Sequence, residues 1–339
     1  MTTGFALIGA GLFGERHAQA YSRHPLVDFV AVCDLDETRA KRLAETYDAR
    51  RHTSSLDDIL ADPAIKAVSV ATPDHAHCAV AVACAQAGKH ILVEKPLATT
   101  AEDAEAIVAA ADAAGVTLMV DFHNRANPPM VATRDAVARG DLGHVSYVYA
   151  RLSNTVAVPQ DMLRWSGRSS ALWFLGSHMV DIVGWILDDK PTRVYVVARD
   201  GVLKGLGIDA PDFHVATVEY GKGTVAVFEH AWILPRTHNT VKDLKLELLG
   251  SEGAAYIDGS HNRTMELYTG EKGSFPDMLV PPFGPHLTGF VLDAVVHFID
   301  AVTTGKPVLA TGEDGLANTR IIAAMSAAAN SGTAVTLDL

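Results

Sequence analysis

The sequence predicts an α/β protein in two parts: a doubly wound parallel sheet at the N-terminus, followed by an α/β domain with a large, open, mostly antiparallel sheet. Three observations support this fold class. Short apolar runs alternate with helical patterns through about residue 121, a glycine-rich turn follows the first of those runs, and β-rich segments with few intervening helices dominate beyond residue 190.

The first apolar run and the residues after it predict a strand, a tight turn and a helix. Residues 5–8 are apolar, as a buried parallel strand requires, and the spacing Gly9-x-Gly11-x-x-Gly14 follows. Gly9 permits the turn, Gly11 lets a pyrophosphate approach the backbone, and Gly14 lets the helix pack closely on the strand. The N–H groups of Leu12 and Phe13 at the helix N-terminus then face the phosphates, so this segment predicts a dinucleotide site.

An acidic residue at the end of the second apolar run favours NAD. Residues 29–33 form that run, and Asp34 follows it, twenty positions after Gly14. A carboxylate at this place accepts hydrogen bonds from a ribose diol and repels a 2′-phosphate, so NAD is expected and NADP is less favoured. The alternative is a glycine-rich turn in an α/β protein that binds no nucleotide.

The alternation that follows predicts the rest of an N-terminal dinucleotide-binding domain, which we expect to span residues 1–122. Gly88 and Gly115 stand where glycines end helices. Further strands are expected at 67–71, 90–93 and 117–120, with helices at 12–24, 36–46, 55–61, 76–87 and 101–114.

Residues 123–311 predict a second, substrate-binding domain. Its helices are expected at 128–139 and 172–187, and its strands at 146–152, 194–199, 214–220, 224–233, 242–248, 254–258 and 264–268. Because few helices remain to cover the second face of such a sheet, we expect a partner subunit there, in a homodimer or homotetramer. A four-proline loop at 276–285 is expected at a pocket edge or lid, and residues 312–339 as a helix and tail that return to the first domain.

The composition is typical of a globular protein and argues against several partners. A 339-residue chain with 48% apolar and 20% charged residues has enough material for two domains. A formal net charge of −12 argues against general binding to nucleic acid or anionic membranes, and no apolar run reaches the roughly 18 residues of a membrane span. The three cysteines form no disulfide or zinc pattern, and no signal peptide precedes the first strand, so we expect a cytoplasmic protein.

Polar residues follow two of the predicted strands, at the edge where ligands bind in doubly wound sheets. Thr72-Pro73 comes after the strand at 67–71, and Glu94-Lys95-Pro96 comes after the strand at 90–93. A lysine in such a site, with its pKa lowered by desolvation, could exchange a hydroxyl proton while hydride leaves the adjacent carbon. A surface lysine after a strand is the alternative for Lys95, and Pro96 is a candidate for a cis bond.

The His75-x-His77 sequence lies close to the first of these clusters. Without cysteines or carboxylates at ligand spacing, it is a poor signal for zinc, so we expect no metal site. A contact to the cofactor or a place at a helix start is the favoured interpretation of His77.

Two polar residues stand inside an otherwise apolar helical pattern further along the chain. Phe174, His178, Asp181 and Trp185 are spaced by four, three and four residues, which places them on one helix face. His178 is then either a buried histidine satisfied by its neighbour Asp181, or a general acid or base that Asp181 orients.

Together these clusters resemble the Gfo/Idh/MocA oxidoreductase family, named for glucose–fructose oxidoreductase, inositol dehydrogenase and a rhizopine catabolism protein. The resemblance spans nearly the whole chain, and it rests on the glycine motif with Asp34, Thr72-Pro73 with His77, Glu94-Lys95-Pro96, His178-x-x-Asp181, Gly305-Lys306-Pro307 and Gly312-Glu313-Asp314-Gly315. It implies a Rossmann domain, an open C-terminal sheet used for oligomerisation, and NAD(P)-dependent oxidation or reduction of a sugar or polyol carbon. It also implies that Lys95 is the main proton-transfer residue and that His178 contacts the substrate hydroxyl.

One departure from the family pattern concerns position 174. Many dehydrogenases of the family carry an Asp four residues before this histidine, where this chain has Phe174. The acid–base layout and the substrate can therefore differ from those of inositol-type members. An apolar side chain there would suit a less hydroxylated substrate or would shape the pocket, and Asp181 or Asp161 is the alternative source of the carboxylate.

The resemblance implies further site residues with weaker support. Asn124, in His123-Asn124-Arg125, is expected near the nicotinamide, and Trp165 is expected to frame the nicotinamide ring or a sugar. Arg164, Arg168 and His286 are additional candidates. For each of these residues an ordinary structural role is the alternative.

The expected function is that of an NAD-preferring dehydrogenase or reductase acting on CH–OH groups of a sugar, polyol or related derivative. Lys95 would be the base in oxidation and the acid in reduction. Two alternatives remain open at this point: a sensor or regulator that binds NAD(H) without turnover, and an oxidoreductase with tightly held cofactor that interconverts two sugars.

Overall fold

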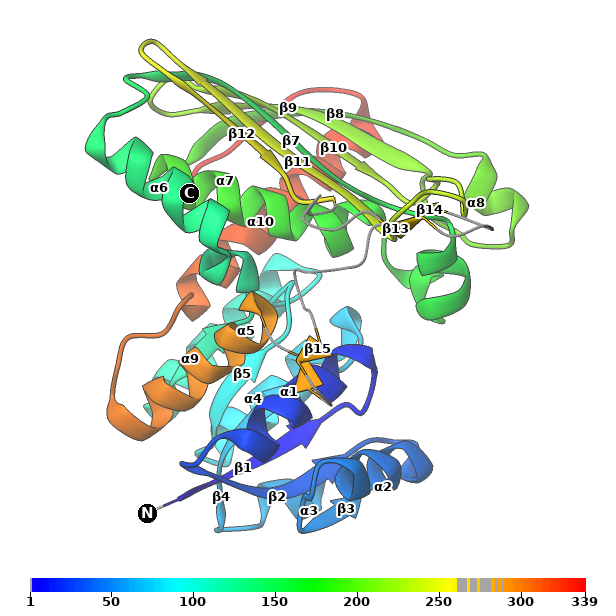
Figure 1. The fold of residues 1–339 in the computed structure, drawn as a ribbon, viewed down its shortest axis with the longest axis vertical. Coiled ribbons are helices and arrows are strands. Elements are labelled where there is room, and N and C mark those ends of the chain that lie inside the picture. Colours follow the sequence, from blue (N-terminus) through cyan, green and yellow to red (C-terminus); the bar gives the residue numbers. More distant parts are fainter. Residues whose placement is uncertain (1, 261–266, 269–272, 275–281, 284–285, 288) are drawn as a thin grey trace. The chain divides into compact units, whose positions relative to one another are not determined.

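A computed structural model of the protein describes residues 2–260, 267–268, 273–274, 282–283, 286–287 and 289–339 (Figure 1). The chain divides into two compact units: unit 1 comprises Met1–Ala126 and Phe290–Thr319, and unit 2 comprises Asn127–Gly289 and Arg320–Leu339. Most of the proline-rich loop expected at 276–285, and the side chain of His286, lie outside the described residues.

Unit 1 is built on a parallel sheet that, in the described part of the chain, has six strands in the order β3-β2-β1-β4-β5-β6. This confirms the predicted doubly wound sheet. The strands are β1 (Thr3–Ile8), β2 (Val27–Cys33), β3 (Arg51–Thr53), β4 (Ile65–Val70), β5 (His90–Val93) and β6 (Leu118–Val120). Strand β3 was not expected, because Arg51, His52 and Thr53 form no apolar run.

The helices of unit 1 alternate with these strands as the pattern predicts. They are α1 (Leu12–Arg23), α2 (Glu37–Thr46), α3 (Leu56–Leu60), η1 (Asp74–Ala76), α4 (His77–Gln86), α5 (Ala101–Ala114) and η2 (His123–Ala126). Gly115 ends α5 with a φ of +64°, a conformation that favours glycine, which confirms the predicted helix end. Side chains of β1 are buried on both faces of the sheet, as parallel strands covered by helices require.

The division into units differs from the boundaries expected from the sequence at the C-terminal part of unit 1. Helix α9 (Phe290–Thr304) belongs to unit 1, because Val295 and Phe298 are buried in the same core as Phe5. The rings of Phe5 and Phe298 meet edge to face at 6.0 Å. Helix α10 (Gly312–Ser331) begins in unit 1, and its residues from Arg320 onward belong to unit 2.

Unit 2 contains a large sheet with the order β12-β11-β7-β10-β9-β8-β17 among the described residues. The pair β7–β10 is parallel and the other pairs are antiparallel, which confirms the predicted, mostly antiparallel sheet. The strands are β7 (Val145–Asn154), β8 (Pro191–Arg199), β9 (Phe213–Tyr220), β10 (Val225–Ala231), β11 (Lys242–Gly250), β12 (Ala254–Asp258) and β17 (Val335–Thr336), and the two-residue strands β13 to β16 are Leu267–Tyr268, Gly273–Ser274, Pro282–Phe283 and His286–Leu287.

The helices of unit 2 lie on one face of this sheet (Figure 1). Met130, Met179 and Met325 from three of these helices share a core with inward-facing sheet residues such as Val148 and Phe228. The helical segments are α6 (Pro128–Arg139), η3 (Val158–Met162), η4 (Ser166–Arg168), η5 (Leu172–Gly176), α7 (Ser177–Leu187) and α8 (Val202–Gly205), together with the second half of α10.

The opposite face of the sheet carries a row of exposed apolar side chains. Leu249 on β11 pairs with Tyr147 on β7, and Tyr147 pairs with Val225 on β10. These three residues are 36–40% exposed, and Tyr256 on the neighbouring strand β12 is 70% exposed. An apolar row across three adjacent strands is unusual for a surface that faces only water.

The cysteines and the helices agree with the composition. Cys33 and Cys84 are buried and Cys78 is partly buried, all three as free thiols, and burial raises the pKa of Cys84 to about 12. None of the helices in the described ranges combines the length and the apolar character needed to cross a bilayer.

Candidate active site

The three glycines after β1 differ in what surrounds them. At Gly9, where φ is +103°, an added Cβ would lie 2.4 Å from the Ala71 carbonyl oxygen, and at Gly14 it would lie 1.9 Å from the Gly9 carbonyl oxygen. At Gly11, by contrast, no described atom lies within 4 Å of the corresponding position. Gly9 and Gly14 therefore close the strand–turn–helix junction, and Gly11 leaves open space beside the backbone, as the approach of a pyrophosphate requires.

The N-terminus of α1 is suited to a phosphate. Gly11 is its N-cap residue and has no side chain that could accept hydrogen bonds from the first turn. The N–H groups of this turn, including those of Leu12 and Phe13, have no partner within the helix itself. Leu12 is 52% exposed. N–H groups without intrahelical partners and the positive end of the helix dipole suit this turn to an anion.

Asp34 is held beside the glycine turn by two backbone groups. The N–H of Ala10 donates to Asp34 Oδ2 at 2.7 Å, and the N–H of Asp36 donates to Oδ1 at 2.8 Å. Each carboxylate oxygen keeps a second lone pair for a ribose hydroxyl. The next residue, Leu35, is 96% exposed and offers apolar surface at the same edge.

His77 joins the two loops that follow β4 and β5. Its Nδ1 lies 2.8 Å from the Pro96 carbonyl oxygen and its Nε2 lies 3.0 Å from the Thr72 carbonyl oxygen. The ring is 1% exposed, and burial lowers the pKa of His77 although these carbonyl groups act in the opposite direction. His77 thus places Thr72 and Pro96, and the buried Thr72 hydroxyl has no hydrogen-bond partner among the described residues.

Lys95 is a buried lysine at the end of β5. It is 4% exposed, and its peptide bond to Pro96, whose isomer the sequence left open, is cis. Its Nζ lies 5.9 Å from the centre of the Phe13 ring in the first turn of α1. Burial lowers the pKa of Lys95, and the negative charges of Glu94, Asp74 and Asp121 partly offset this effect. A lysine in this environment can release a proton nearer to neutral pH than an exposed lysine can.

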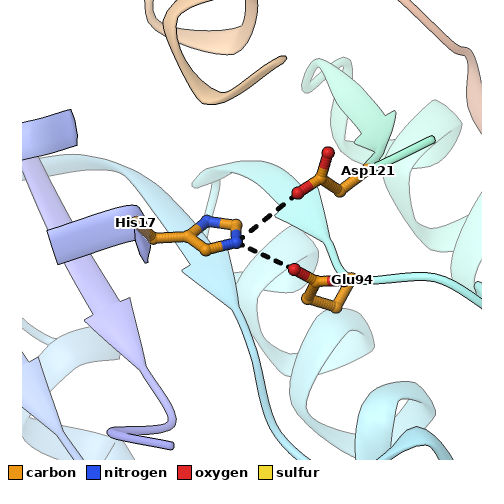
Figure 2. A group of neighbouring side chains, drawn as sticks. All are labelled: His17, Glu94 and Asp121. Atoms are coloured by element: carbon orange, nitrogen blue, oxygen red, sulfur yellow. Dashed lines mark hydrogen bonds and ion pairs between the residues drawn. The ribbon is translucent and has the colours of Figure 1, made fainter. Parts of the chain in front are cut away.

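Behind Lys95, three side chains form a compact buried group. His17 of α1 points its Nε2 toward Glu94 Oε1 at 3.0 Å and toward Asp121 Oδ2 at 3.6 Å (Figure 2). Within the described ranges, this is the group of potential metal-ligand atoms that lie within 4.8 Å of one another, and His75 and His77 are not part of it. His17 Nε2 and Glu94 Oε1 are at hydrogen-bonding distance from each other.

Asn124 and Arg125 follow β6 and have different surroundings. Asn124 is 4% exposed. Arg125 donates to Asp314 Oδ2 at 3.2 Å and so attaches η2 to the start of α10. Gly315 lies in the first turn of α10, and an added Cβ at this position would lie 3.0 Å from Leu97 Cβ. The absence of a side chain at Gly315 therefore permits close packing against the loop that carries Lys95. Arg125 therefore has a structural role.

His178 of unit 2 lies in the first turn of α7, directly after a π-helical segment. The sequence pattern predicted one continuous α-helix over 172–187, but residues Leu172–Gly176 are π-helical. The face shared by Phe174, His178 and Asp181 was derived from α-helical spacing, which does not apply across this segment. His178 and Asp181 are both buried, 8% and 7% exposed.

Aromatic rings surround Phe174, the position where the family carries a carboxylate. The Phe174 ring lies 6.0 Å from the ring of Trp165 and 6.0 Å from the ring of Trp232. The buried Nε1 of Trp232 has no hydrogen-bond partner among the described residues. Asp161, an alternative source of the carboxylate, instead forms an exposed ion pair with Arg236 at 2.5 Å. The rings of Phe174, Trp165 and Trp232 together form what we call the aromatic wall of unit 2.

Sequence reasoning missed three residues of this site. His17 lies three residues after Gly14 in the buried stripe of α1, where a polar residue is itself a signal. Asp121 follows β6 directly, in the same place where Glu94 follows β5, and the same rule could have identified it. Leu35 carried no signal beyond following Asp34. Arg164 and Arg168, two weaker candidates from the sequence, are exposed.

Comparison with known proteins agrees with this geometry. Residues 3–122 match the oxidoreductase family domain described as an NAD-binding Rossmann fold, and residues 134–337 match the C-terminal α/β domain of the same family. The inositol 2-dehydrogenase of Rhizobium meliloti (strain 1021) is 30% identical to the chain over 319 residues, which cover 94% of each protein.

Two further relatives have names or titles that mention a substrate or a cofactor. The levoglucosan dehydrogenase of Pseudarthrobacter phenanthrenivorans is 30% identical over 234 residues, which cover 64% of this chain and 59% of that protein. The crystal structure of GenD2 from gentamicin A biosynthesis, in complex with NAD, matches with a TM-score of 0.86 and 28% identity, covering 100% of this chain and 97% of that chain. The glycine turn, the buried lysine and both family matches lead to one conclusion: the chain belongs to the Gfo/Idh/MocA family of oxidoreductases.

Proposed function

We propose that this protein is an NAD-dependent dehydrogenase or reductase of a sugar or polyol carbon, with Lys95 as its proton-transfer residue. The observation that carries the proposal is the placement of a buried lysine at the end of β5, at the same sheet edge as the glycine turn and Asp34. In a doubly wound sheet this edge is where ligands bind.

The residues that would hold NAD fit its parts. The open space at Gly11 and the first-turn N–H groups of α1 suit a pyrophosphate, and Asp34 suits the adenosine ribose. Pro73, beside Thr72, the side chains of His77 and Glu94 behind the loops, and Asn124 after β6 are proposed to line or support the nicotinamide end. The nicotinamide, when bound, accepts or supplies the hydride.

Lys95 would exchange the proton that accompanies oxidation or reduction. In oxidation the neutral amine takes the hydroxyl proton, and in reduction the ammonium returns it. Burial favours the neutral amine and the nearby carboxyl groups favour the ammonium, and the net effect is a pKa of Lys95 below that of an exposed lysine. His178 is proposed to bind the substrate hydroxyl in unit 2.

The aromatic wall of unit 2 favours a substrate with fewer hydroxyl groups than inositol. Phe174 and Trp165 are partly buried and offer ring faces that pack on C–H surfaces, the fully buried Trp232 packs behind Phe174, and Phe174 cannot accept a hydrogen bond. Levoglucosan, the substrate in the name of one relative, is an anhydro sugar of this kind. We therefore propose anhydro and deoxy sugars as the favoured substrate class.

The test is a spectrophotometric screen at 340 nm with NAD and NADP against inositols, sugars, sugar acids, and deoxy and anhydro sugars. The proposal predicts turnover of an anhydro or deoxy sugar that exceeds turnover of any inositol. In the matched variant Phe174→Asp, which restores the family carboxylate, the preference is expected to move toward inositols. Turnover restricted to inositols in the unmodified protein would refute the substrate class.

The outer face of the large sheet is proposed as the surface through which copies of the chain associate. The apolar row Leu249–Tyr147–Val225 supports this, because it crosses three strands and is continuous with Tyr256. Light scattering after gel filtration is expected to give a dimer or tetramer, and Leu249→Glu is expected to lower the mass toward the monomer. A monomeric unmodified protein would contradict this proposal.

A further inference from the structure

The proposed function gives no role to His17, which forms a buried group with Glu94 and Asp121. The three side chains are 1%, 6% and 1% exposed and come from α1 and from the ends of β5 and β6 (Figure 2). Burying two carboxyl groups beside a lysine is unfavourable unless their charges are paired or neutralised. The protonation of this group therefore determines the electrostatic environment of Lys95.

Hydrogen bonds from the interior of unit 1 determine which ring nitrogen of His17 carries its proton. The Tyr21 hydroxyl lies 2.5 Å from Ser69 Oγ, and Ser69 Oγ lies 2.8 Å from His17 Nδ1. The Tyr21 hydroxyl is buried and Ser69 is its partner among the described residues, so we assign Tyr21 as the donor and Ser69 as the acceptor. Ser69 then donates to Nδ1, which leaves the ring proton on Nε2, where it is donated to Glu94 Oε1 at 3.0 Å.

The two carboxyl groups consequently have different environments. Burial alone would raise the pKa of Glu94, but the hydrogen bond from His17 and the charge of Lys95 lower it to about 2. Burial, the charge of Glu94 and a hydrogen bond shared with Glu94 raise the pKa of Asp121 well above its ordinary value. The negative charge of the pair is therefore favoured on Glu94 rather than on Asp121.

The ionisable groups around Lys95 come from several elements. Glu94 precedes it, Asp74 lies in η1, and Asp121 follows β6, and these three carboxyl groups all act on Lys95. Two histidines contact these carboxyl groups: His17 Nε2 lies 3.0 Å from Glu94 Oε1, and His123 Nδ1 lies 3.9 Å from Asp121 Oδ1. Of these groups, His17 is the one that is hydrogen-bonded to Glu94, the residue next to Lys95.

We propose that His17 is a positioning residue for Lys95: by donating to Glu94, which lies closer to its Nε2 than Asp121 does, it fixes a negative charge on the residue next to the lysine and thereby the pH at which Lys95 exchanges a proton. The consequence for catalysis rests on the proposed function, since Lys95 must be the proton-transfer residue for this pH to appear in a rate profile.

Four variants separate this role from a merely structural one. His17→Leu removes the donor, so Glu94 takes up a proton, and Glu94→Gln removes the charge directly. Both are expected to lower the apparent pKa of Lys95 by roughly one to two pH units, as the loss of one nearby charge in a buried site implies. His17→Gln retains an N–H donor and is expected to restore most of the shift.

Asp121→Asn is the matched control. It replaces the carboxyl group whose ionisation burial and Glu94 disfavour with a neutral amide of the same shape, so the apparent pKa of Lys95 is expected to move by less than in His17→Leu or Glu94→Gln. A structural disturbance of the group would instead affect this variant as much as the others.

The first readout needs no turnover. The pH dependence of acetylation of Lys95 by acetic anhydride, measured by peptide mass spectrometry on the full-length protein, reports its proton affinity directly. The pH profile of kcat/KM is the second readout. Unshifted acetylation in both His17→Leu and Glu94→Gln, or an equal shift in Asp121→Asn, would overturn the inference. Shifted acetylation with an unchanged rate profile would support the inference and remove Lys95 from the proposed mechanism.

Discussion

Asp34 should determine the preference for NAD over NADP, and the size of its effect can be worked out from the structure. Its carboxylate is fixed by the Ala10 and Asp36 N–H groups, so it cannot easily turn away from a ligand at the glycine turn. A carboxylate about 5 Å from a phosphate with about two negative charges is disfavoured by about 1.5 kcal/mol even in a water-like medium. The lost hydrogen bonds to a ribose diol amount to about 1.5–3 kcal/mol more.

Asp34→Ala should therefore reduce the ratio of NADH affinity to NADPH affinity by about 10²-fold or more. The loss of the bond to Ala10 weakens both cofactors alike, so it cancels in the ratio. Asp34→Asn keeps an oxygen for Ala10 but removes the charge, and should reduce the ratio by only about tenfold. The assay is fluorescence titration of both reduced cofactors, which requires no substrate. An unchanged ratio in Asp34→Ala would refute the reasoning.

Further predictions concern the glycine turn and acid stability. Gly14→Ala places a Cβ 1.9 Å from the Gly9 carbonyl oxygen and should lower the melting temperature sharply. Gly11→Ala, with no described atom within 4 Å of the new Cβ, should keep the melting temperature but bind NADH at least about tenfold more weakly. Calorimetry and NADH titration check these two results, and equal melting temperatures of the two variants would contradict the prediction. Burial lowers the pKa of His230 to about 3 and that of His214 to about 4. Because the unfolded chain then binds more protons, the free energy of unfolding should fall below pH 6.5, by about 1.4 kcal/mol per pH unit for each histidine. The free energy of unfolding, measured by urea unfolding with circular dichroism, should depend less steeply on pH in His230→Phe than in the unmodified protein. The same dependence on pH in both proteins would be evidence against this prediction.

The parts of the fold that sequence could predict are those with a local signal. Residues 5–8 and the glycines after them predict a strand, a turn and a helix, because each feature depends on neighbours in sequence. Strand β3 has no such signal, since only its pairing with β2 makes it a strand. The apolar face of α9 is visible in the sequence, but that face does not say which of two sheets it covers.

The candidate site shows the same limit. Lys95 could be predicted because it follows a buried strand, and the ends of parallel strands gather at one edge. The contact between His17 and Glu94 could not, because 77 residues separate them and the pairing depends on how α1 packs on the sheet. The π-helical segment before His178 was also missed, because the 3.6-residue period was extended across it.

The central claim, that Lys95 transfers a proton in an NAD-dependent reaction, is tested most directly by Lys95→Met with two readouts. Lys89→Met is the matched control, because Lys89 is also buried in unit 1 but donates to the backbone carbonyls of Asp62 and Ile65. We predict that Lys95→Met binds NADH within about threefold of the unmodified protein while kcat falls by about 10²–10⁴-fold, and that Lys89→Met loses stability and keeps its kcat. A Lys95→Met variant that retains full turnover would contradict the account.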